Sequence, residues 1–156
     1  MGVRKFLESV SGFIGIHTIP QIVGNNMKID IHVHTKKTKQ GDAQTREIDA
    51  QRFHEIISST DVKIVAITNH NHFDISQYND FTKIIGDDFQ IWPGVELDIV
   101  ENGRRGHLLV VVSPDHSQEM ETTMNSIMPN KITPNDFEIS IDDVVSNFDY
   151  LKPLYT

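Results

Sequence analysis

The sequence predicts an α/β fold in which strands and helices alternate along the chain. Apolar and polar residues alternate over 28–35, whereas 62–68 is apolar almost throughout, as is typical of a strand buried on both faces of a parallel sheet. Other segments repeat apolar residues at helical spacing. The order strand, helix, strand, helix, strands, helix therefore indicates α/β architecture with right-handed crossovers.

The first half of the chain divides at its polar loops. We expect residues 1–26 to form an extension, with a short amphipathic helix that ends before Pro20. The domain proper then covers 27–156 and opens with the strand 28–35. A basic loop over 36–42 with the breaker Gly41 follows, and next come a helix over 45–59 and the strand 62–68.

The second half continues the alternation. Asp74 is a plausible N-cap for a helix that ends at Ile85, with Gly86 at the position after its C-cap. Two further helices are expected at 117–128 and, capped by Ser140 and Asp143, through Phe148. Three strands are expected between these helices, at 89–92, 95–100 and 107–112, with a bend at Gly94 and a turn over 101–106.

Composition limits the function. The chain has 156 residues, no cysteine and a net charge of −8. The lack of cysteine excludes disulfides, thiolate catalysis and cysteine-type zinc sites, and it fits a cytoplasmic location. The acidic charge argues against a general nucleic-acid coat, and no apolar run approaches the roughly 20 residues of a membrane span, so no membrane partner is expected.

Five potential metal ligands lie near predicted strand ends. His32 and His34 alternate with apolar residues on the first strand, and His70 follows the buried strand. Glu96 and His107 begin later strands. In parallel α/β folds functional groups gather at the carboxyl ends of strands, which fits the first three residues best.

The chemistry of this set favours a multinuclear metal site. Imidazoles suit zinc, manganese or iron, and a carboxylate can bridge two ions spaced about 3.5–4 Å apart. Such ions lower the pKa of bound water and clamp the oxygens of a phosphoryl group. Asp30 shares the face of His32 and could orient that ring through its second nitrogen.

The motifs together resemble the PHP (polymerase and histidinol phosphatase) family over roughly Met27 to Asp115. They are collinear and are His32-Val-His34-Thr35, Ala66-Ile-Thr-Asn-His70-Asn71, Pro93-Gly-Val-Glu96 and His107-Leu-Leu-Val-Val111. The resemblance implies a partial, distorted (β/α)7 TIM-like barrel that hydrolyses phosphate esters with metal-bound hydroxide. It implies two or three divalent ions (Zn, Mn or Fe) in a complete site.

The resemblance also implies ligand roles. His32 and His34 would bind a first metal, Glu96 would bridge two, His107 would bind the second, and His70 would belong to the third. Asp42 is a further candidate ligand in the loop after the first strand, where the family commonly places an acid. Lys36, Lys37 and Lys39 in the same loop are candidate phosphate-binding residues.

The chain departs from the family pattern at three places. The family usually writes Thr-Asp-His-Asp where this chain has asparagine at 69 and 71. Its loop acid lies in a Ser-x-x-Asp-Gly type sequence, which is inverted here as Gly41-Asp42. No later histidine-ending strand or final Asp-x-His follows residue 116, so we expect a PHP domain truncated before its last metal-binding motifs.

Three functions stay open at this point. The first is a metal-dependent phosphoesterase acting on a phosphorylated small molecule or a nucleic-acid end. The second is a non-catalytic or regulatory PHP module of a larger protein with a C-terminal ATPase, polymerase or other module. The third is an amidohydrolase-like metal hydrolase, since those barrels also open with His-x-His on the first strand.

Overall fold

The computed structural model describes residues 27–42, 47–84, 88–128 and 133–148. Its strands are β1 (Lys28–Val33), β2 (Val62–Ile67), β3 (Gln90–Glu101) and β4 (Arg104–Val111). Its helices are α2 (Ala50–Ser58), α3 (Ile75–Ile84), α4 (Ser117–Ile127) and α5 (Ile141–Asn147), and a 3-10 turn covers Pro114–His116. The expected extension helix and the expected Gly86 cap lie outside these residues.

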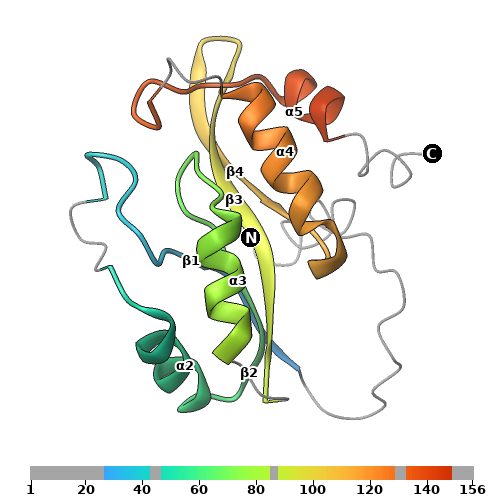
Figure 1. The fold of residues 1–156 in the computed structure, drawn as a ribbon. Coiled ribbons are helices and arrows are strands. Elements are labelled where there is room, and N and C mark those ends of the chain that lie inside the picture. The colour runs from blue at the N-terminus through green and yellow to red at the C-terminus, as the bar shows by residue number, and fades with distance from the viewer. Residues whose placement is uncertain (1–26, 43–46, 85–87, 129–132, 149–156) are drawn as a thin grey trace.

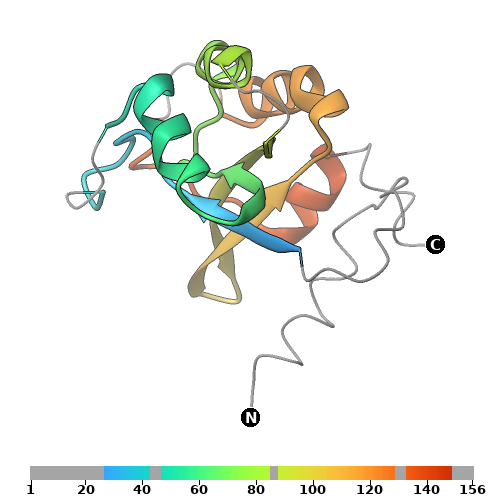
Figure 2. The same ribbon diagram turned by 90° about the horizontal axis from the view of Figure 1, so that it is seen from below.

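The described strands form one curled, four-stranded sheet in the order β1-β2-β3-β4 (Figure 1). β1 pairs parallel with β2 and β2 pairs parallel with β3, whereas β3 and β4 form an antiparallel hairpin. Figure 2 shows α2, α3 and α4 side by side along one face of the sheet. The mixed α/β class expected from the sequence is therefore confirmed, with a sheet that curls like half of a barrel.

Helix caps follow the sequence closely. The Asp49 side chain accepts a hydrogen bond from the Arg52 amide, so α2 begins at Ala50 rather than at the expected residue 45. Asp74 accepts from the Gln77 amide at 3.0 Å and caps α3 as predicted. Ser140 accepts from the Asp143 amide at the start of α5, which confirms that cap.

The core lies between the sheet and these helices. β2 is buried along its last four residues, as expected for a strand covered on both faces. Each of α2, α3 and α4 contributes to the core a pair of large buried side chains at helical spacing. These pairs are Phe53 and Ile57, Tyr78 and Phe81, and Met120 and Met124.

β1 is an edge strand and is less buried than its alternation suggests. Ile31 and Val33 are half-buried, but Ile29 is 52% exposed. Alternation alone would bury Ile29 together with Ile31 and Val33, but Ile29 lies near the start of an edge strand that has no described neighbour on its outer side.

The expected break at Pro93-Gly94 is also wrong, since β3 runs without interruption from Gln90 to Glu101. Pro93 is the last β3 residue paired with β2, so its missing amide hydrogen costs little there. Gly94 serves close packing instead of a bend: a Cβ at this position would lie 2.7 Å from the Thr68 Cγ2. The hairpin turn is likewise shorter than expected, with only Asn102 and Gly103, both at positive φ, between β3 and β4.

Among the described residues, no helix is both long enough and apolar enough to cross a membrane.

Candidate metal centre

The long β3 carries Glu96 past the end of β2, where it meets the loop that contains His70. The backbones of the two residues form an isolated parallel bridge, with Asn71 N donating to Glu96 O at 2.7 Å and Glu96 N donating to Asn69 O at 3.2 Å. Val95 and Leu97 point into the core, so the alternation of the strand turns Glu96 to the opposite face. The buried carboxylate therefore lies beyond the carboxyl ends of β1 and β2.

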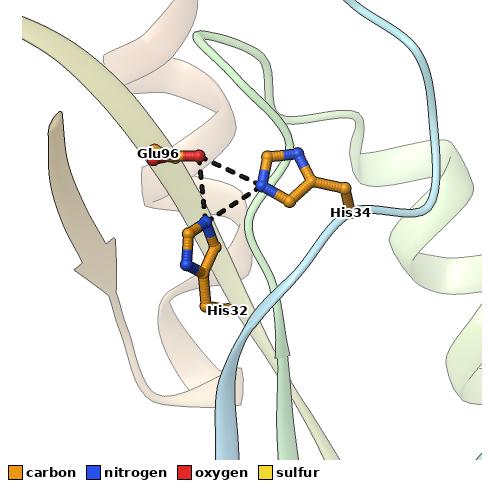
Figure 3. Close-up of side chains that lie close together, drawn as sticks. All are labelled: His32, His34 and Glu96. Carbon is orange, nitrogen blue, oxygen red and sulfur yellow. Dashed lines mark hydrogen bonds and ion pairs between the residues drawn. The ribbon is translucent and has the colours of Figure 1, made fainter. Parts of the chain in front are cut away.

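Three imidazoles converge on one oxygen of this carboxylate. Nε2 of His32, of His34 and of His70 lies 3.0, 3.0 and 2.9 Å from Glu96 Oε2. Figure 3 shows His32 on β1 and His34 just beyond it, both turned toward Glu96 on β3. The two rings are also close to each other, with 3.0 Å between their Nε2 atoms.

His107 approaches the other oxygen from the hairpin partner. Its Nδ1 lies 2.7 Å from Glu96 Oε1. Ligand atoms that could hold a cation therefore form two groups, His32, His34 and Glu96 on one side and His70, Glu96 and His107 on the other. Within each group the atoms lie within 4.8 Å of one another, and Glu96 belongs to both.

The donor set fits a divalent cation. In a tetrahedral zinc site with bonds of about 2.0–2.1 Å, ligand atoms are roughly 3.3 Å apart, close to the separations seen here. A carboxylate oxygen has two lone pairs, so hydrogen bonds alone give a weak reason for three ring nitrogens to surround it. A shared carboxylate is also the usual bridge between two ions about 3.5–4 Å apart.

Two residues of the site, His34 and Glu96, favour the charge states that metal ligands need. Burial lowers the pKa of His34, and the neighbouring His70 lowers it further, so its neutral imidazole is favoured. Burial raises the pKa of Glu96, but the hydrogen bond from His32 and the charges of His70 and His107 outweigh burial and lower the pKa overall. An ionised carboxylate and a neutral imidazole are both competent to bind a cation.

Asp42 lies behind His70 and belongs to neither of the two ligand groups among the described residues. Its Oδ1 is 2.7 Å from His70 Nδ1, a close ion-pair contact without hydrogen-bond alignment. Its Oδ2 accepts the amides of Thr38 and Lys39, at 2.9 and 2.8 Å. Burial raises the pKa of Asp42, and these amides with the charge of His70 lower it below its usual value. Asp42 therefore faces His70 as an anion.

The three loop lysines differ in their contacts. Lys36 Nζ lies 3.4 Å from Asp74 Oδ2, and the Lys39 ammonium pairs with Asp98 in a half-buried contact. Lys37 is exposed. Two of the three candidate phosphate-binding residues are thus already paired with carboxylates.

The side chains of Asn69 and Asn71 form hydrogen bonds with backbone groups of distant segments. Asn69 Oδ1 accepts the amides of Thr35 and Lys36 at 2.9 and 3.1 Å, which fixes the chain just after His34. The Asn71 side chain accepts a hydrogen bond from the Asp98 amide and donates to the Asp98 carboxylate and to the Pro134 carbonyl. Asp30 accepts from the His32 amide, so the expected contact of its carboxylate with the His32 ring is wrong.

Asp98 is the residue near this site that sequence reasoning missed. It lies two residues after Glu96 on the same face of β3 and opposite His107 in the hairpin register. The sequence does carry a signal, since Glu96-Leu-Asp98 alternates as a strand does, but its use requires the register of the following hairpin.

No protein-family model matches the chain, and no curated protein matches its sequence.

Proposed function

We propose that the chain is a metal-dependent phosphoesterase of the PHP type, with a site formed by His32, His34, His70, Glu96 and His107. One observation carries the proposal: three imidazole nitrogens surround a single buried carboxylate oxygen, and a fourth imidazole faces the other oxygen. The order of these residues along the chain also follows the PHP motifs.

In this proposal the described residues hold the metal and place the substrate. His32 and His34 with Glu96 would hold one ion, and His70 and His107 with Glu96 the other. Divalent ions bound in such a site would lower the pKa of a bound water molecule and neutralise the charge of a phosphoryl group. The Glu96 carboxylate would serve as a ligand in both groups, and the exposed sides of the His32 and His107 rings leave the site open to a phosphate ester.

A metal-binding module without catalysis is the second candidate. The side chains of His32 and His107 are 49% and 54% exposed, so the described residues form an open site. Efficient phosphoester hydrolysis usually needs a shielded site in which charges act at low dielectric. An open site with intact ligands suits a module that binds metal within a larger ATPase- or polymerase-type protein.

The test measures bound metal and p-nitrophenyl phosphate hydrolysis on the same purified protein. We expect at least one bound Zn, Mn or Fe ion per chain and a hydrolysis rate that His32→Ala and Glu96→Ala abolish. His54→Ala, which removes an imidazole from α2 outside the site, should change neither.

Metal binding without hydrolysis would favour the non-catalytic module. Folded protein that binds none of these metals would overturn both candidates.

A further inference from the structure

Asp98 and His107 lie directly opposite each other in the β3–β4 hairpin. Residues opposite each other in an antiparallel pair share a face of the sheet, and Glu96 lies two residues earlier on that same face. The hairpin thus presents two carboxylates to one imidazole.

The His107 ring spans these two carboxylates. Its Nδ1 is 2.7 Å from Glu96 Oε1, and its Nε2 is 3.3 Å from Asp98 Oδ1. A neutral imidazole carries one proton, on either nitrogen. A nitrogen that binds a cation must present its lone pair, so Nδ1 can act beside Glu96 only when the proton is on Nε2, the side of Asp98.

Asp98 is held in place on its other side. Its amide donates to Asn71 Oδ1 at 2.8 Å, and Asn71 Nδ2 donates back to Asp98 Oδ2 at 3.0 Å. The Lys39 ammonium pairs with the same Oδ2 and balances its charge. Asp98 Oδ1 is buried and receives no hydrogen bond from the described residues, so its 3.3 Å contact with His107 Nε2 is an ion-pair contact without hydrogen-bond alignment, and the oxygen has lone pairs left to accept that N–H.

We propose that Asp98 is a positioning residue that accepts the Nε2 proton of His107 and thereby turns the Nδ1 lone pair toward Glu96. Lys39 is then the counter-ion of Asp98 rather than a residue that binds phosphate. The inference rests on the proposed metal centre for its role, but the proton's location is a property of the metal-free chain.

The first experiment titrates the full chain with Zn²⁺ by calorimetry. Loss of a carboxylate that orients a ligating histidine typically weakens metal binding about 10- to 100-fold, and we expect Asp98→Ala to do so for the ion held with His107. Asp61→Ala is the matched control, because it removes one charge from the exposed Lys28–Asp61 pair at the opposite end of β1 and β2. Equal affinity in wild type and Asp98→Ala would overturn the proposal.

A double-mutant comparison separates positioning from a general structural role. If Asp98 acts through His107, then Asp98→Ala has no further effect on Zn²⁺ affinity once His107 is alanine. Additive losses would overturn the proposal. If Asp98→Ala does not fold, Asp98→Asn replaces it in the same comparison with a smaller expected loss, because the neutral amide oxygen is a weaker acceptor than the carboxylate.

A second readout needs no metal. Nitrogen-15 NMR of the metal-free chain at mildly alkaline pH reports which ring nitrogen of His107 carries the proton. In the metal-free chain Glu96 Oε1 competes for the proton from the Nδ1 side, so we expect a mixture in which wild type has a larger Nε2–H share than the Asp98 variant. Equal shares in the two proteins would overturn the proposal. If wild type binds no Zn²⁺ but shows this tautomer difference, the proposed function fails while the Asp98–His107 relationship stands.

Discussion

Asn71 and Asp98 are joined by two hydrogen bonds although 27 residues separate them in the sequence. Asn71 is fully buried, adopts a positive φ of 47°, and also donates to the Pro134 carbonyl at 2.8 Å. A single side chain thus connects the His70 loop, β3 and the segment that leads to α5.

Replacing Asn71 should therefore be costly for two separable reasons. Asn71→Ala leaves the half-buried Asp98 amide without its acceptor and places alanine in the left-handed region, so we expect a loss of roughly 2–4 kcal/mol in unfolding free energy. Asn71→Gly loses the same hydrogen bonds without the backbone strain and should be roughly 1 kcal/mol less destabilising. Urea unfolding of both variants measures this difference. Equal stabilities of the two variants would contradict a backbone contribution.

Gly94 tests how tightly β3 must approach β2. An added Cβ would lie 2.7 Å from Thr68 Cγ2 and 3.1 Å from the carbonyl oxygens of Ile67 and Val110. Because two of these neighbours are backbone atoms, we expect Gly94→Ala to cost about 1–3 kcal/mol in unfolding free energy.

Gly106→Ala is the matched control for this substitution. Its Cβ would meet Ile99 Cγ1 at 3.7 Å, an ordinary contact, so its unfolding free energy should stay near that of wild type. Similar losses for both glycines would show that close packing at Gly94 is not the cause.

The sequence predicts the ligand set better than the strands that carry it. Alternation and the carboxyl-end rule place His32, His34 and His70 at one edge of the sheet, and the structure brings them together there. Glu96 was expected near the start of a separate strand over 95–100, after a bend at Gly94, and so away from the carboxyl ends. It joins them because β3 continues past the end of β2 without a break. The relative length of two strands is set by tertiary pairing rather than by local sequence.

Residues that support the ligands were harder to predict. Asp98 acquires its neighbours from the hairpin register, Asn69 acquires its backbone partners from the loop after β1, and Asn71 acquires its own from β3 and the segment at Pro134. Such partners are distant in sequence, so local periodicity carries no information about them.

Tyr78 gives the fold a pH dependence at high pH. Burial, together with the charge of Asp115, raises the pKa of Tyr78 from 10.0 to about 12, and its hydroxyl donates to the Ile91 carbonyl at 3.2 Å. Folding therefore favours the neutral phenol. This stabilisation is fully present below the unfolded pKa of 10.0 and is lost as the pH rises through about 12.

Tyr78→Phe isolates that contribution. The variant should lose about 1 kcal/mol below pH 10 through the missing hydrogen bond, yet fall less steeply than wild type as the pH rises toward 12. Urea unfolding across this range measures both slopes. Parallel slopes in the two proteins would contradict a role for the Tyr78 hydroxyl.

Elemental analysis of the purified chain measures directly whether the chain binds metal through the proposed centre, which consists of His32, His34, His70, Glu96 and His107. We expect stoichiometric zinc, manganese or iron in wild type and in His54→Ala, and a marked loss in Glu96→Ala, because Glu96 belongs to both ligand groups. The proposed metal centre would be contradicted if Glu96→Ala folds like wild type and retains the same metal content. It would also be contradicted if folded wild-type protein holds no metal after incubation with each of these ions.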